Sequence, residues 1–66
     1  MKLIEHSTND NRTFVLLEGN SQVDSDAMVK KMAEDKPDFS TLHTLCDARG
    51  VLLFLYEKVT TPPLNG

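Results

Sequence analysis

A chain of 66 residues with a net charge of −3 and one cysteine can form a single small domain and cannot form an internal disulfide. Ten acidic residues against seven basic ones disfavour nonspecific binding to nucleic acid or to anionic membranes, which requires a basic surface. The longest apolar run, residues 51–56, is far shorter than the ~20 residues that span a bilayer. Because the N-terminus also lacks a signal-peptide pattern, we expect a cytoplasmic protein.

The N-terminal part of the chain predicts a β-hairpin. Residues 2–7 are typical of a strand, and residues 12–18 form a stronger one, rich in aromatic and branched side chains. The polar residues 8–11 between them tolerate turn geometry. Pairing the strands around the middle of that turn predicts the register Leu3–Leu16 and Ile4–Val15.

A helix is predicted over residues 24–35. Asp24 or Ser21 can cap its N-terminus, and Pro37 disfavours helical geometry at the residue before it, which marks the end of the helix. Phe39 is expected to pack beneath the last helical turn. Apolar residues at helical spacing predict one stripe that faces the sheet: Ala27, Met28, Val29, Met32 and Ala33.

The segment 41–59 predicts a second hairpin, with two strand-like runs joined by residues 47–50. Asp47 suits the first position of a type I turn, and Gly50 suits the left-handed position that follows it. Both faces of this hairpin are apolar, so both need cover. The turn fixes the predicted pairs as Cys46–Leu52, Leu45–Leu53, Thr44–Phe54, His43–Leu55 and Leu42–Tyr56.

Together these elements predict an α+β fold with the order β-β-α-β-β. We expect a mostly antiparallel four-stranded sheet with one helix packed on one face, built as a single domain from residues 1–59. The order of the strands across the sheet is not determined by these patterns. Residues 60–66 contain two prolines and are predicted to form a flexible C-terminal tail.

The sequence predicts no catalytic, cofactor-binding or metal-binding residues. His43 and Cys46 lie three residues apart in a predicted strand, so their side chains point to opposite faces and are not placed to share a metal. Cys46 has neither a base nor a cation beside it that would activate it as a nucleophile. The acidic residues around the helix are diluted by lysines, which favours an ordinary solvated surface over an acidic docking face.

We therefore expect the protein not to be an enzyme and interpret it as a macromolecule-interaction module that acts as a small acidic homodimer. The reason is that one helix can cover only one face of a sheet whose last strand is apolar on both sides. The predicted dimer interface is Leu45, Val51, Leu53 and Leu55. Besides a second copy we expect a protein partner, with no role for nucleic acid or membrane. Two alternatives stay open: a small-ligand-binding protein or minimal enzyme with its site at the subunit boundary, and an acidic inhibitor that mimics nucleic acid.

Overall fold

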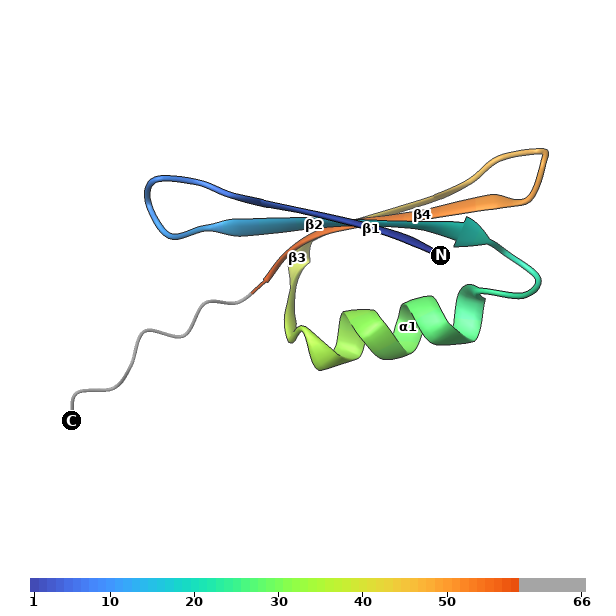
Figure 1. Ribbon diagram of the computed structural model, residues 1–66, viewed down its shortest axis with the longest axis horizontal. Coiled ribbons are helices and arrows are strands. Elements are labelled where there is room, and N and C mark those ends of the chain that lie inside the picture. Colours follow the sequence, from blue (N-terminus) through green and yellow to red (C-terminus); the bar gives the residue numbers. More distant parts are fainter. Residues whose placement is uncertain (59–66) are drawn as a thin grey trace.

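The structure is a computed structural model that describes residues 1–58. It contains a four-stranded sheet in the order β1-β2-β4-β3, with every neighbouring pair antiparallel. One helix lies against one face of this sheet (Figure 1). The predicted α+β fold is thereby confirmed, whereas the predicted tail at 60–66 lies outside the described residues. The elements are β1 (Lys2–Ser7), β2 (Thr13–Asn20), α1 (Ser25–Glu34), β3 (Pro37–Cys46) and β4 (Val51–Lys58).

Both hairpins turn through the same backbone geometry. In the second, the N–H of Asp47 donates to the carbonyl of Val51 (3.0 Å), and Gly50 has a φ of 84°. In the first, the N–H of Thr8 donates to the carbonyl of Arg12 (2.8 Å), and Asn11 has a φ of 64°. Asn11 thus occupies the left-handed position that Gly50 fills in the other loop, which asparagine tolerates better than most residues.

The predicted register of the first hairpin is wrong by one residue. Leu3 pairs with Leu17 and Ile4 with Leu16, not with Leu16 and Val15. The physical reason is the left-handed residue Asn11, which adds one residue to the loop compared with a turn centred on the middle of the polar cluster. A slip of one residue moves every side chain to the other face of a strand, so this difference affects which residues enter the core.

The predicted register of the second hairpin is confirmed from Cys46–Leu52 to His43–Leu55. It does not continue to the predicted Leu42–Tyr56 pair, because a β-bulge lies between Asp38 and His43. Thr41 replaces the interrupted backbone pairing there. Its Oγ1 accepts a hydrogen bond from the N–H of Glu57 (2.9 Å) and donates one to the carbonyl of Asp38 (2.7 Å).

The core lies between α1 and the sheet. Its buried side chains are Val15, Leu17, Met28, Phe54 and Tyr56, with Met32, Leu42 and Leu52 packed against them. The predicted helical stripe was too wide: Met28 is buried and Met32 is half-buried, but Ala27, Val29 and Ala33 are exposed. A single helix on a sheet contacts it along a narrow line, and here that line follows the i, i+4 pair of methionines.

Phe39 does not pack beneath the helix, as its sequence position predicted; its side chain is 68% exposed. The helix ends at Glu34, and Lys36 turns the chain with a φ of 53°. Pro37 then starts β3 and is buried, whereas Phe39 two residues later is exposed. Phe39 lies in the bulged part of β3, where the regular alternation of the strand is lost.

The start of the helix also differs from the prediction. Asp24 occupies the N-cap position, but its side chain makes no capping hydrogen bond to the helix. Its Oδ2 instead accepts a hydrogen bond from the N–H of Asn20 at the end of β2 (2.8 Å). The side chain of Asn20 accepts hydrogen bonds from the N–H groups of Gln22 and Val23. These bonds fix the β2–α1 connection.

Gly19 of β2 lies close to the start of α1. A Cβ atom at this position would lie 2.7 Å from the Cβ of Asp24 and 2.9 Å from the Sδ of Met28. We expect Gly19→Ala to lower the free energy of unfolding by about 1–3 kcal/mol, because the helix must shift to relieve the overlap. Urea unfolding followed by circular dichroism measures this change, with the exposed-helix variant Lys30→Ala as control. Equal midpoints for Gly19→Ala and the wild type would contradict the close approach.

Candidate interaction surface

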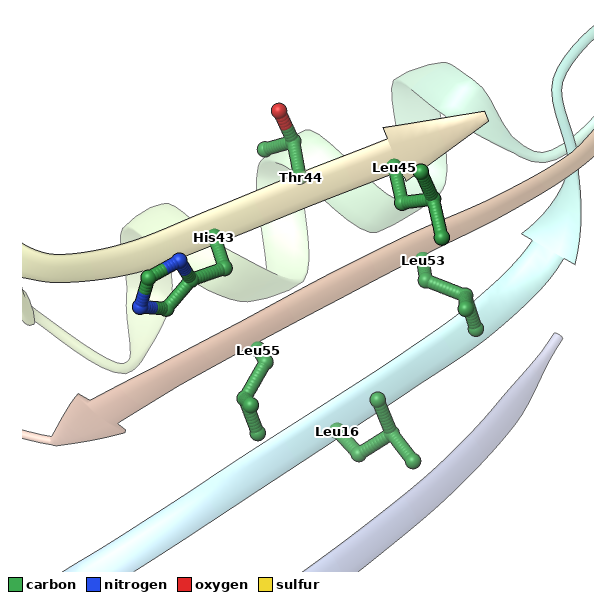
Figure 2. Close-up of a pocket in the computed structure, with 6 residues that line it drawn as sticks. All are labelled: Leu16, His43, Thr44, Leu45, Leu53 and Leu55. Atoms are coloured by element: carbon green, nitrogen blue, oxygen red, sulfur yellow. The ribbon is translucent and has the colours of Figure 1, made fainter. Parts of the chain in front are cut away.

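The sheet face opposite α1 is the most distinctive surface of the molecule. We call it the open face and define it by Leu16, His43, Leu45, Val51, Leu53 and Leu55, which the strand register and the alternation of side chains place on one side. Figure 2 shows five of these residues projecting from β2, β4 and β3, with the helix behind the sheet. All four residues predicted for a dimer interface are therefore on the same face.

A shallow hollow of about 210 Å³ lies on the open face. Four leucines line it together with His43 and Thr44, although Figure 2 shows the Thr44 side chain pointing away from the others. Leu45 is 62% exposed and Leu55 43% exposed. The hollow is smaller than the roughly 300–1,000 Å³ typical of small-molecule sites, and its lining is almost wholly apolar.

Leu16 belongs to the open face but was not among the predicted interface residues. Its position depends on β2 lying beside β4, where Leu16 pairs with Leu55. That strand order could not be predicted from the pattern of either hairpin alone. The signal was nevertheless present, since residues 14–17 of β2 are apolar at consecutive positions, as expected of a strand with an apolar residue on both faces.

Charged groups of both signs lie at the two ends of the open face. At one end Lys2 of β1 is opposite Glu18 of β2 in the strand register. At the other, the Arg12 guanidinium donates two hydrogen bonds to Glu57, both of 2.9 Å, and lies over the ring of Phe14 at 5.1 Å. The hydrogen bonds from Arg12 lower the pKa of Glu57, which keeps this carboxylate ionised. The open face is thus apolar in the middle, with residues of both charges at one end and the Arg12–Glu57 ion pair at the other.

A second cluster of polar groups lies on the other side of the sheet, at the C-terminal end of α1. The hydroxyl of Tyr56 donates to Asp35 Oδ2 at 2.6 Å, and Lys31 Nζ lies 3.0 Å from Asp35 Oδ1. Lys58 Nζ lies 3.7 Å from the same oxygen and 3.4 Å from Glu5. The Asp35 side chain is only 7% exposed. This cluster connects α1 to β4 and to β1.

The pKa values of Asp35 and Tyr56 are shifted in opposite directions, the first downward and the second upward. Burial raises the pKa of Asp35, but hydrogen bonds from Tyr56 and Lys31 and the charge of Lys58 lower it further, so that the pKa lies below its usual value. Burial, followed by the hydrogen bond to Asp35, raises the pKa of Tyr56 far above its usual value. A general acid or base works best with a pKa near the operating pH. The Asp35–Tyr56 pair therefore holds the structure together and is poorly suited to proton transfer.

Metal ligands and reactive groups are scattered across the described part of the chain. His43 lies on the open face, and Cys46 alternates to the other side of β3, as the sequence predicted. Among residues 1–58, no three His, Cys, Asp or Glu side chains are grouped so that they could hold a metal ion. Within the same residues, the single helix is neither long nor apolar enough to cross a membrane.

Comparison with known proteins identifies no match: no protein-family model, no curated protein and no solved structure resembles the chain. The function of the protein therefore has to be inferred from its own surface, of which the open face is the most distinctive part.

The buried carboxylate predicts a pH-dependent stability. Because the pKa of Asp35 is lower in the folded state than its unfolded value of about 4, its interactions stabilise the fold above that pH and are lost as the pH falls through the folded-state pKa. We expect Asp35→Asn to lower the free energy of unfolding by about 1–3 kcal/mol at neutral pH. The gap to the wild type should narrow below about pH 4.

Urea unfolding at several pH values measures this gap. Glu34→Gln, at an exposed helix position, serves as the control and should change stability by less than about 0.5 kcal/mol at each pH. A gap for Asp35→Asn that stays constant into the acid range would show that the Asp35 carboxylate is not the group responsible.

Proposed function

We propose that the protein is a non-catalytic macromolecule-interaction module whose open face binds a second copy, giving a homodimer as the working unit. The exposed leucines on that face are the observation that supports this most strongly. Soluble monomers rarely leave a continuous apolar patch of this kind in water. A further protein partner, not yet identified, and a cytoplasmic location are part of the same proposal.

The energetics favour covering the open face. Fully burying a leucine side chain contributes about 1.5–3 kcal/mol relative to leaving it exposed. A chain of this size has a net stability of only about 5 kcal/mol, so that covering a few leucines would change its stability substantially. Within residues 1–58, the hydrophobic core between α1 and the sheet consists of five buried side chains, with three partly buried ones packed against them.

The charge distribution favours a second copy as the occupant. Two identical open faces would meet without like-charge repulsion, because their middles are uncharged and Arg12 and Glu57 are paired at the end. Two observations argue against the alternative functions, which are an acidic inhibitor that mimics nucleic acid and a ligand-binding protein or minimal enzyme. The carboxylates of Asp35, Asp47 and Glu57 all lie beside cations, which weakens any imitation of nucleic-acid phosphates. The hollow is also small for a ligand or a substrate.

Association through the open face can be tested with one charged substitution. Leu53 lies in the middle of the face on β4 and is half-buried, so Leu53→Glu would place a carboxylate at the centre of the interface. In sedimentation equilibrium at tens of micromolar, we expect the wild type to associate and Leu53→Glu to reduce its mean mass to about half. Lys30→Glu, on the exposed side of α1, should leave the mass unchanged.

The proposal fails if the wild type sediments as a single 7.4 kDa chain. It also fails if Leu53→Glu keeps both the wild-type circular dichroism spectrum and the wild-type mass.

A further inference from the structure

The two edges of the sheet differ in their protection against pairing with another strand. The strand order leaves β1 and β3 at the edges. β1 carries Lys2 and Glu5, and Glu5 lies within 3.4 Å of Lys58. β3 contains no Asp, Glu, Lys or Arg from residue 39 to residue 46. Natural sheets usually guard exposed edges with charged residues, prolines or bulges. In β3 these lie in its first half, at Pro37, Asp38 and the bulge before His43, so residues 43–46 form the unguarded part of the edge.

The hydrogen-bond pattern identifies which backbone groups of β3 point outward. The bond between Asp47 and Val51 closes the hairpin, so the pairs bonded to β4 alternate from there and include Leu45–Leu53 and His43–Leu55. The N–H and C=O groups of Thr44 and Cys46 therefore point away from β4. The bond from Ser21 to the carbonyl of Gly50 gives the same result independently, because it directs residues 52, 54 and 56 of β4 toward β2.

The apolar surface of the open face continues to this same edge. The hollow is lined by residues of β2, β4 and β3 and by none of β1. Leu45 on the edge strand is more exposed than Leu55 on the strand beside it, at 62% against 43%. Apolar side chains therefore span this face from Ile4 of β1, which pairs with Leu16 and is 45% exposed, to Leu45 of β3. At β3 they meet an edge whose outward backbone groups have no strand partner among residues 1–58.

We propose that β3 pairs with β3 of a second copy, antiparallel and about a two-fold axis at Leu45. In this register Leu45 lies opposite Leu45 of the second copy, as a pair without mutual backbone bonds, where side chains approach most closely. Thr44 lies opposite Cys46 of the second copy, and the outward backbone groups of both residues exchange hydrogen bonds. No like-charged residues meet across this edge, because the paired segment of β3 has none.

Edge pairing extends the open face rather than competing with it. The two-fold axis is perpendicular to the sheet, so both helices lie on one side and both open faces on the other. One open face offers roughly 500 Å² of flat area, for strands about 4.8 Å apart and about eight residues long, which is near the lower limit for a specific interface. A pair of joined sheets offers roughly twice that area. Two such pairs packed through their open faces form a four-chain assembly with D2 symmetry.

Disulfide trapping tests the register. In a Cys46→Ser background, Leu45→Cys places the two thiols opposite each other across the two-fold axis, and we expect mild oxidation to link most chains into covalent dimers. Phe39→Cys in the same background is the matched control, since it is an exposed position of the same strand outside the paired segment. Adding Leu53→Glu removes association through the open face, so cross-linking that persists comes from the edge. Equal trapping at residues 39 and 45, or none at either, would overturn the proposal.

Thr44→Pro tests the role of the backbone. Proline removes an N–H that points outward, so the hairpin with β4 should remain folded, as edge strands tolerate proline. We expect a wild-type circular dichroism spectrum, loss of the Leu45→Cys cross-link and half the wild-type mass, whereas Thr44→Val should keep both the cross-link and the mass. An unfolded Thr44→Pro chain, or one that still cross-links, would overturn the assignment of this edge.

The experiments distinguish association through the open face from association through the β3 edge. Cross-linking at residue 45 that survives Leu53→Glu supports the edge even if association through the open face is absent. A mass that falls with Leu53→Glu but not with Thr44→Pro supports the open face alone and rejects the edge.

Discussion

The structure depends on the hydrogen bonding of β4 along both of its sides. β4 pairs with β2 over residues 51–58 and with β3 over most of the same length, and its pairing with β2, the other interior strand, joins the two hairpins. Side chains that alternate along β4 point to the two opposite faces of the sheet. Phe54 and Tyr56 are buried under α1, whereas Leu53 and Leu55 lie on the open face. The core, the open face and the unpaired edge of β3 all follow from the position of this one strand.

The parts of the fold that were predictable from the sequence are those set by local chemistry. Gly50 after Asp47 identifies the turn, and the turn then fixes the register of the second hairpin as far as His43. The first hairpin has no glycine in its loop. Asn11 adopts the left-handed conformation instead, and asparagine at that place in a polar cluster does not distinguish between neighbouring registers. The bulge in β3 is likewise specified by side-chain hydrogen bonds of Thr41 that no pattern of hydrophobicity reveals.

Tertiary arrangement accounts for the remaining differences. The apolar stripe of the helix includes Ala27, Val29 and Ala33, but a small sheet and one helix share only a narrow line of contact, and Met28 and Met32 occupy it. The predicted interface residues lie on one face because alternation along β3 and β4 is local. Leu16 could be assigned to that face only once β2 was known to lie beside β4. The strand order is a long-range property, and it decides how much of the apolar surface is continuous.

The interior position of β4 also constrains how the chain can acquire its fold. The partners that close the sheet are far apart in sequence, as in the bond between Arg12 and Glu57, which are separated by 45 residues. An isolated two-stranded hairpin is only marginally stable in water, so β1 and β2 become stably folded only when β4 pairs with β2. Until then the inner edge of β2 is an unpaired apolar strand. Contacts of such long range slow folding and prolong the exposure of that strand to other chains. During synthesis on a ribosome, the inner edge of β2 therefore stays unpaired and open to association with other chains until residues 51–58 have emerged.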